Sequence, residues 1–217
     1  MKKQIIPSLI AKNQKELDKR FGKVKFHSKS FHLDIMDGKF VENKSLMFNF
    51  KLSKGKKYEA HLMVKNPEEW IKKNLKKTDL IIFHIESCEN ESEAKKIINR
   101  IKSKKKKIGI AINPKTSVKK IIPFLNSIDM VLILTVKPGN YGARFLPNTL
   151  KKVKEIRKLK PKLDIEVDGG ISEKTISLAG KSGANSFVSG SYLQKSLDVK
   201  KAIERLKIIS RKINRNS

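Results

Sequence analysis

Cysteine is almost absent from this sequence. The single cysteine, Cys88, excludes an internal disulfide and a cysteine-rich metal cage. If the protein binds a metal ion, the available ligands are therefore histidines and carboxylates.

Long hydrophobic runs are also missing. No apolar stretch approaches the roughly 20 residues that a membrane span requires. The opening residues, MKKQIIPSLIAKNQ, lack the long apolar region and the small-residue cleavage site of a signal peptide. We therefore expect no membrane segment and a cytoplasmic location.

Acidic and aromatic residues are both scarce. Lys and Arg number 50 against 21 Asp and Glu, so the formal net charge is +29, and aromatic residues make up 6% of the chain. Such a charge fits a nucleic-acid-binding protein, which would show strong, salt-dependent binding. The lysines are instead spread over most expected helices and turns, without interleaved aromatic side chains for base stacking. We therefore favour a lysine-rich solvated surface over a nucleic-acid partner, with a positive field that attracts small anions.

The apolar residues are organised in short, evenly spaced blocks. Eight such blocks are expected to form β-strands, and segments with helical spacing lie between them. Apolar strands that alternate with helices indicate an α/β fold with a parallel sheet, and eight such units close most naturally into a (β/α)8 or TIM barrel. We expect a single barrel domain over residues 1–217. The expected strands are residues 4–10, 31–36, 58–64, 79–86, 107–113, 130–136, 163–168 and 184–190.

The intervening segments differ in quality. Residues 66–77, 91–104, 147–159 and 172–183 are amphipathic, and some open with an Asn, Ser or Pro start signal. The connection at 43–57 has poor periodicity, and we expect it to be short or irregular.

Polar residues occur near the C-terminal ends of three expected strands, where barrels of this kind place their chemistry. In FHLDIM, residues 31–36, alternation puts His32, Asp34 and Met36 on one side of the strand. His61 and Met63 form a similar pair on the third strand, and Asp168 ends the seventh. Two imidazoles and two carboxylates could thus converge, a set suited to one Zn²⁺, Fe²⁺, Mn²⁺ or Co²⁺.

Simpler interpretations exist for several neighbouring residues. A histidine in an apolar strand is more often a hydrogen-bonded core residue than a metal ligand, which is our interpretation of His84, and His27 is expected at the surface. Asp37 precedes a glycine and is expected to serve a turn. Met36 and Met63 could simply fill the core.

Glycine-rich turns follow the last three expected strands. These turns are KPGNYG, DGG and SGS. Glycine lets backbone N–H groups approach an anion, and a short helix that starts after Ser191 would direct its positive end to the same place. Three such turns at one rim favour a phosphate-bearing substrate.

The motifs resemble those of the ribulose-phosphate 3-epimerase family along nearly the whole chain. The similar segments are IIPSLIA, HLDIMDGKFVEN, AHLMVKNPEEWI, IGIAINPKT, TVKPGNYGARFLPNTLKKVKEIR, IEVDGGISEKT and GANSFVSGSYL. The resemblance implies a ribulose-phosphate-binding (β/α)8 barrel that interconverts D-ribulose 5-phosphate and D-xylulose 5-phosphate. It also implies one divalent metal ion per subunit, here Zn, Fe, Mn or Co, and a homo-oligomer.

The resemblance also assigns roles to residues. His32, Asp34, His61 and Asp168 match the metal-ligand positions of the family, and Asp34 and Asp168 match its two catalytic acid/base positions. The positions that match substrate-binding residues are Ser8, Met36, His61, Met63, Gly139, Gly142, Asp168, Gly169, Gly170, Gly190 and Ser191.

The chemistry explains these residue types. Inversion at C3 of a ketose removes a proton from one face and returns one to the other through a cis-enediolate, so two carboxylates must flank the carbon. A metal ion would stabilise the charge on O2 and O3. We expect Asp34 to act as the base and Asp168 as the acid in the forward direction.

Departures from the family pattern lie mainly in the loop PGNYGA, where Asn140, Tyr141 and Ala143 replace the usual residues. These changes leave open a 3-epimerase of a related ketose phosphate, such as a hexulose 6-phosphate. A 3-hexulose-phosphate synthase is disfavoured, because LDIMDG lacks the Asp-x-Lys-x-x-Asp motif of that group.

Overall fold

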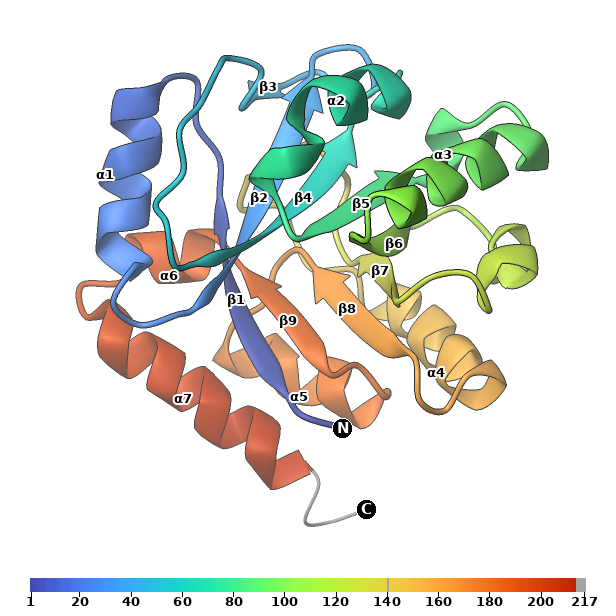
Figure 1. The fold of residues 1–217 in the computed structure, drawn as a ribbon. Helices are drawn as coiled ribbons and strands as arrows, with labels where there is room; N and C mark the ends of the chain where they lie inside the picture. Colours follow the sequence, from blue (N-terminus) through green and yellow to red (C-terminus); the bar gives the residue numbers. More distant parts are fainter. Residues whose placement is uncertain (140, 214–217) are drawn as a thin grey trace.

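The structure is a computed structural model that describes residues 1–139 and 141–213. Its central feature is a closed barrel of eight parallel strands with helices on the outside, the predicted TIM barrel (Figure 1). Neighbouring strands follow the order β1-β9-β8-β7-β6-β5-β4-β2, and pairing of β1 with β2 closes the barrel. The two-residue strand β3 adds antiparallel to the rim of β2.

Each predicted strand is present, with ends shifted by a few residues. The strands are β1 Gln4–Leu9, β2 Ser30–Asp37, β3 Lys44–Ser45, β4 Lys57–Met63, β5 Leu80–His84, β6 Lys107–Ile112, β7 Met130–Leu134, β8 Asp164–Asp168 and β9 Ser186–Ser189. The α-helices are α1 Gln14–Val24, α2 Pro67–Asn74, α3 Glu91–Ser103, α4 Leu150–Leu159, α5 Glu173–Lys181, α6 Ser191–Lys195 and α7 Val199–Lys212. Short 3-10 helices are η1 Leu75–Lys77, η2 Ile85–Ser87, η3 Val118–Lys120, η4 Ile122–Phe124 and η5 Pro147–Thr149.

The alternation of side chains along β2 explains how the barrel keeps two different faces. Phe31, Leu33 and Ile35 are fully buried in the main core between the strands and the helices. His32 and Asp34, between them in sequence, point to the inside of the barrel, as predicted. A separate apolar cluster fills another part of the interior and consists of Ile82, Ala111, Met130, Leu132 and Leu134.

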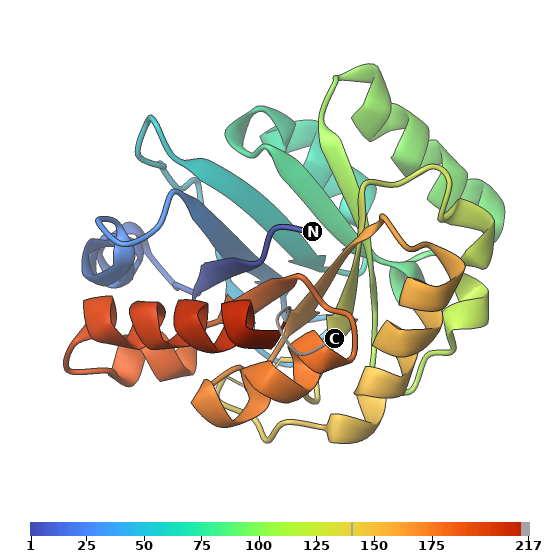
Figure 2. The ribbon, with the colours of Figure 1, turned by 90° about the horizontal axis from the view of Figure 1, so that it is seen from below.

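The helices form where the sequence supplies both a cap and an apolar face. Asn13, Asn66 and Asn90 each accept a backbone N–H at the start of α1, α2 and α3. In α3 the buried residues recur at helical spacing. These residues are Ala94, Ile97, Ile98 and Ile101. Each buried isoleucine contributes about 1.5–3 kcal/mol to stability because its apolar surface is removed from water. Figure 2, seen from the end where the strands begin, shows the helices surrounding the barrel.

Two connections depart from the regular helical pattern. Residues 38–56 contain β3 and turns instead of a helix, which confirms the irregular segment predicted at 43–57. Between β6 and β7 the connection forms only the 3-10 helices η3 and η4. Pro123 lies in η4 and lacks the backbone N–H that a longer helix through this segment would use.

In the described part of the chain, no helix has both the length and the apolar character to cross a membrane.

Asp37 ends β2 and stabilises the predicted turn that follows it. Its carboxylate accepts the backbone N–H groups of Lys39, Phe40 and Lys65 at 2.8–2.9 Å.

Candidate active site

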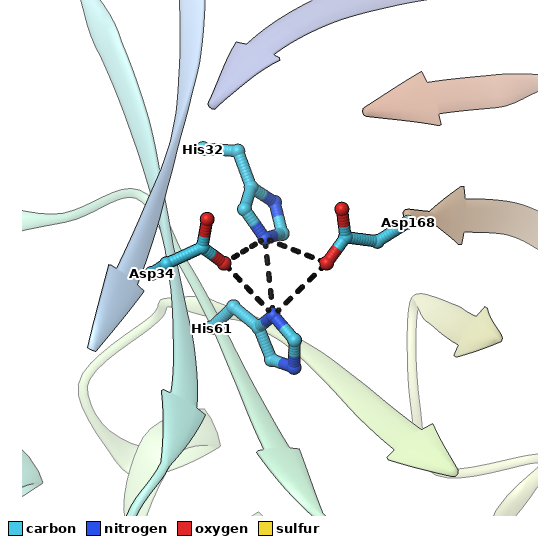
Figure 3. A group of neighbouring side chains, drawn as sticks. All are labelled: His32, Asp34, His61 and Asp168. Carbon is cyan, nitrogen blue, oxygen red and sulfur yellow. Dashed lines mark hydrogen bonds and ion pairs between the residues drawn. The ribbon is translucent and has the colours of Figure 1, made fainter. Parts of the chain in front are cut away.

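Three strands bring the four predicted metal ligands to one point inside the barrel. His32 and Asp34 come from β2, His61 from β4 and Asp168 from the end of β8. The parallel register pairs Asp34 directly with His61. Because side chains two apart on a strand share a face, His32 points the same way as Asp34. Figure 3 shows the four side chains turned toward one another.

The distances among these groups fit a single ion. His32 Nε2 lies 3.1 Å from His61 Nδ1 and 3.3 Å from Asp34 Oδ1. His61 Nδ1 lies 3.3 Å from Asp34 Oδ1 and 3.6 Å from Asp168 Oδ2, and His32 Nε2 lies 4.0 Å from the latter oxygen. Ligands about 2.0–2.2 Å from a tetrahedral ion are about 3.3–3.6 Å apart. The donor set and its spacing therefore suit a divalent cation, which these four largely buried side chains could surround.

Burial and charge act against each other in this cluster. Burial lowers the pKa of His32 and of His61, but the carboxylates around them raise the pKa of both imidazoles above the ordinary value. Burial raises the pKa of Asp34, but the charge of His32 and hydrogen bonds from both imidazoles bring that pKa below its ordinary value. For Asp168 burial prevails, and the pKa is raised. A bound cation would compensate both carboxylates in place of a protonated imidazole.

Two buried glutamates support His32 from the other side. His32 Nδ1 lies 2.7 Å from Glu59 Oε1 and 3.3 Å from Glu166 Oε1. Burial, together with the neighbouring Glu166 carboxylate, raises the pKa of Glu59 to about 8. Neither glutamate was predicted from the sequence as part of the site. The signal was present, because each lies two residues before a predicted ligand and so shares its inward face: His61 for Glu59 and Asp168 for Glu166.

His84 also belongs to this neighbourhood. The sequence pattern favours a hydrogen-bonded core residue at this position, and the structure does bury His84 completely. Its Nε2 lies 2.8 Å from Nε2 of His61, so it contacts a predicted ligand as well as the core. His27, expected at the surface, is half-buried in the turn before β2.

A cavity opens over the two aspartates at the C-terminal ends of the strands. Its lining includes every residue predicted to contact a substrate except His61, which is fully buried. The predicted residues that line it are Ser8, Met36, Met63, Gly139, Gly142, Asp168, Gly169, Gly170, Gly190 and Ser191. Contact of these residues with a substrate stays a prediction.

The glycine turns owe their shape to backbone conformations that other residues rarely adopt. Gly169 has φ +108°, and a Cβ at this position would lie 2.4 Å from Val136 Cγ2. Thr135 Oγ1 donates to the carbonyl oxygens of Asp168 and Gly169 at 2.8 and 2.6 Å, which holds the turn beneath the cavity. Helix α6 begins at Ser191, as expected for the short helix after the last strand.

The loop with the unusual sequence reaches into the same cavity. Tyr141 lines the cavity, and the guanidinium carbon of Arg20 lies 5.3 Å from the centre of its ring. Arg20 is in turn paired with Glu16 at 2.9 Å on the same face of α1. Helix α1 thus supports the loop, while Asn140 lies outside the described residues.

Comparison with known proteins gives a consistent result. Residues 4–194 match the Ribulose-phosphate 3 epimerase family. The chain is 39% identical over 196 residues to the ribulose-phosphate 3-epimerase of Schizosaccharomyces pombe, an alignment that covers 86% of this chain and 85% of that protein. It is 38% identical over 188 residues to the protein of that name from Methanocaldococcus jannaschii, with coverage of 82% and 77%. For the Bacillus subtilis protein of that name the identity is 33% over 186 residues, with coverage of 81% and 84%.

Solved structures of similar shape are more distant in sequence. The 3-hexulose-6-phosphate synthase from Salmonella typhimurium superimposes with a TM-score of 0.69 at 12% identity, covering 97% of this chain and 99% of that one. The structure of KGPDC from Streptococcus mutans gives a TM-score of 0.68 at 15% identity, with coverage of 98% and 99%. At such identities the likeness concerns the barrel fold alone.

Proposed function

Because the chain belongs to the ribulose-phosphate 3-epimerase family and is thus an epimerase, we propose that it interconverts D-ribulose 5-phosphate and D-xylulose 5-phosphate. The observation that carries this proposal is the pair of carboxylates, Asp34 and Asp168, at the base of one cavity with two imidazoles between them. Epimerisation at C3 needs proton acceptors on both faces of the carbon, and this arrangement offers one from each of two strands.

The proposed cofactor is one divalent metal ion per subunit, with Zn, Fe, Mn and Co as the candidates. His32, Asp34, His61 and Asp168 would hold it, since their facing atoms lie within 4.8 Å of one another. When bound, the ion would act as a Lewis acid for negative charge on the substrate oxygens. The histidines would serve as ligands only, because both are completely buried.

The two aspartates would carry the protons. Asp34 on β2 and Asp168 on β8 approach the cavity from different strands, which suits attack from opposite faces of one carbon. In the forward direction Asp34 takes the C3 proton and Asp168 returns one to the other face, and the roles exchange in the reverse direction.

The cavity rim would hold the rest of the sugar phosphate. Ser8 would contact the substrate, while Met36 and Met63 form an apolar wall. His61, predicted as a substrate contact, is fully buried beneath this lining and would act only through the ion. The phosphate would lie at the turns that contain Gly139, Gly142, Gly169, Gly170, Gly190 and Ser191, where backbone N–H groups can face an anion. We further propose that residues 1–217 form one domain and that the protein assembles as a homo-oligomer.

The test is exchange of the C3 proton with D₂O across a panel of ketose phosphates that includes hexulose 6-phosphates. Protein loaded with Mn²⁺, Zn²⁺ or Fe²⁺ should exchange the C3 proton of ribulose 5-phosphate and form xylulose 5-phosphate. Asp168→Asn should abolish conversion, whereas Asp18→Asn on exposed α1 serves as the control and should not change it. Metal-loaded protein that binds the pentose phosphate without any C3 exchange would contradict the assignment, and exchange confined to a six-carbon substrate would replace it with the related epimerase.

A further inference from the structure

Two polar residues next to the site, the buried His84 and the partly exposed Glu86, have no part in the proposed proton transfer. His84 ends β5, and Glu86 follows it in η2. His84 is completely buried, although a neutral imidazole with unmet hydrogen bonds is unfavourable in a core. The contacts of His84 with His61 and Glu86 supply hydrogen-bond partners for both of its ring nitrogens.

The contacts form a chain that starts at a proposed ligand. His61 Nε2 lies 2.8 Å from His84 Nε2, and His84 Nδ1 lies 3.0 Å from Glu86 Oε2. The rings of His61 and His84 are stacked with centres 5.0 Å apart, and the ring of Phe40 lies 4.8 Å from that of His84. Glu86 is held in place by the backbone N–H of Asn113, which donates to its other oxygen at 2.7 Å.

The direction of the hydrogen bonds from His61 through His84 to Glu86 follows from the carboxylate of Glu86. An ionised carboxylate can only accept, so His84 Nδ1 carries a hydrogen and donates to Glu86. In a neutral His84, Nε2 is then an acceptor. The contact between the two Nε2 atoms is a hydrogen bond only if His61 Nε2 donates. When His61 is neutral, its Nδ1 is therefore left with a free electron pair.

That free nitrogen faces the proposed cation site. His61 Nδ1 lies 3.3 Å from Asp34 Oδ1 and 3.6 Å from Asp168 Oδ2, and in Figure 3 the other ring nitrogen points away from the cluster. Without the hydrogen bond to His84, His61 could instead carry its hydrogen on Nδ1, where it would bond to Asp34 and block a metal ion. His32 is arranged in the matching way, since its Nδ1 contacts Glu59 at 2.7 Å and its Nε2 faces the cluster.

We propose that His84 and Glu86 are positioning residues that hold His61 in the form with hydrogen on Nε2, leaving Nδ1 to bind a divalent cation. This inference rests on the proposed metal site and adds residues that act on it indirectly. Hydrogen bonds of this kind orient a ligand and raise its basicity, and their loss lowers metal affinity by about 10- to 100-fold.

The first measurement needs no variant. In metal-free protein, at a pH high enough for His61 to be neutral, long-range ¹⁵N–¹H NMR of the histidine rings reports which nitrogen of His61 carries the hydrogen, with His61→Gln used to assign its signals. The proposal expects hydrogen on Nε2. A His61 with its hydrogen mainly on Nδ1 overturns the proposal, whether or not the protein is an epimerase.

The second measurement is the affinity for Co²⁺ or Zn²⁺, by competition with a chromophoric chelator. His84→Leu and Glu86→Leu should each weaken binding by about 10- to 100-fold. His84→Gln, whose amide can accept from His61 and donate to Glu86, should retain most of the affinity. His27→Leu, which removes a histidine outside the cluster, should leave it unchanged.

The outcomes separate the two proposals. Equal affinity in wild type, His84→Leu and Glu86→Leu overturns the positioning role, even if all three are active epimerases. Loss of affinity in the leucine variants with recovery in His84→Gln supports it, even if the substrate proves to be a different ketose phosphate. A wild-type protein that binds neither ion contradicts the metal site itself.

Discussion

At the scale of single residues, buried acidic side chains are the unusual property of this protein. Asp34 is 7% exposed and Glu166 only 1%. Acidic groups are retained in such places when partners compensate them, and here His32 lies between Glu59 and Asp34. The carboxylate of Asp34 therefore places negative charge inside the barrel that a cation can balance, and this is the physical basis of the proposed function.

Glu86 gives a prediction for pH dependence. Burial raises its pKa, but hydrogen bonding to His84 and the backbone N–H of Asn113 bring the pKa down to about 2, below the ordinary 4.5. The folded state thus favours the ionised form, so its contribution to stability is complete above pH 4.5 and is lost as the pH falls toward 2. By pH 3 the loss should be on the order of 2 kcal/mol.

The measurement is urea unfolding of wild type and Glu86→Gln in metal-free protein between pH 7 and pH 3. The difference in unfolding free energy between them should shrink as the pH falls. A difference that stays constant over this range would contradict the assigned pKa shift.

At the scale of elements, the turn after β8 shows how backbone conformation shapes the site. Gly169 follows Asp168 directly and has φ +108°, with Val136 packed where a side chain would begin. The hydrogen bonds from Thr135 hold this turn to the end of β7. The position of the proposed acid thus depends on a conformation that favours glycine.

Gly169→Ala should therefore destabilise the fold by about 1–3 kcal/mol and reduce the rate of C3 exchange, since Val136 and the turn must both move. Gly22→Ala is the matched control. Gly22 lies inside α1 with open space where a Cβ would be, so alanine should stabilise the protein by about 0.5–1 kcal/mol without an effect on exchange. Urea unfolding and the exchange assay measure both effects. Equal stability of the two variants would show that the turn tolerates a side chain.

At the scale of the whole molecule, the net charge of +29 dominates the electrostatics. A sugar phosphate carries negative charge, so the field of the protein should speed its approach. This attraction operates over a screening length of about 30 Å at 0.01 M salt and about 10 Å at 0.1 M.

We therefore expect kcat/KM for the phosphorylated substrate to fall severalfold over this range of ionic strength while kcat changes little. Steady-state kinetics in NaCl test this, with an uncharged sugar analogue as a control for general salt effects. A kcat/KM that does not depend on salt would mean that the surface charge has no part in substrate capture. Tight binding of RNA or DNA that weakens steeply with salt would favour the nucleic-acid alternative.

Much of the fold and part of the site could be predicted from the sequence. Alternation along residues 31–36 placed His32 and Asp34 together on the inside of the barrel, and apolar blocks predicted all eight parallel strands. These patterns are local, because side-chain direction in a strand repeats every two residues. Poor periodicity at 43–57 likewise predicted an irregular connection.

Only the tertiary structure decided which buried groups meet across strands. His84 and Glu86 carry no local sign of a link to His61, since the link depends on the pairing of β4 with β5, where His61 lies opposite Ile82, and on ring orientations within the closed barrel. The sequence by itself determined the strands, the inward faces and the ligand types, because these follow from local periodicity. The closure of the barrel decided the distances and the direction of the hydrogen bonds, because contacts between residues far apart in sequence form only when the strands are in register.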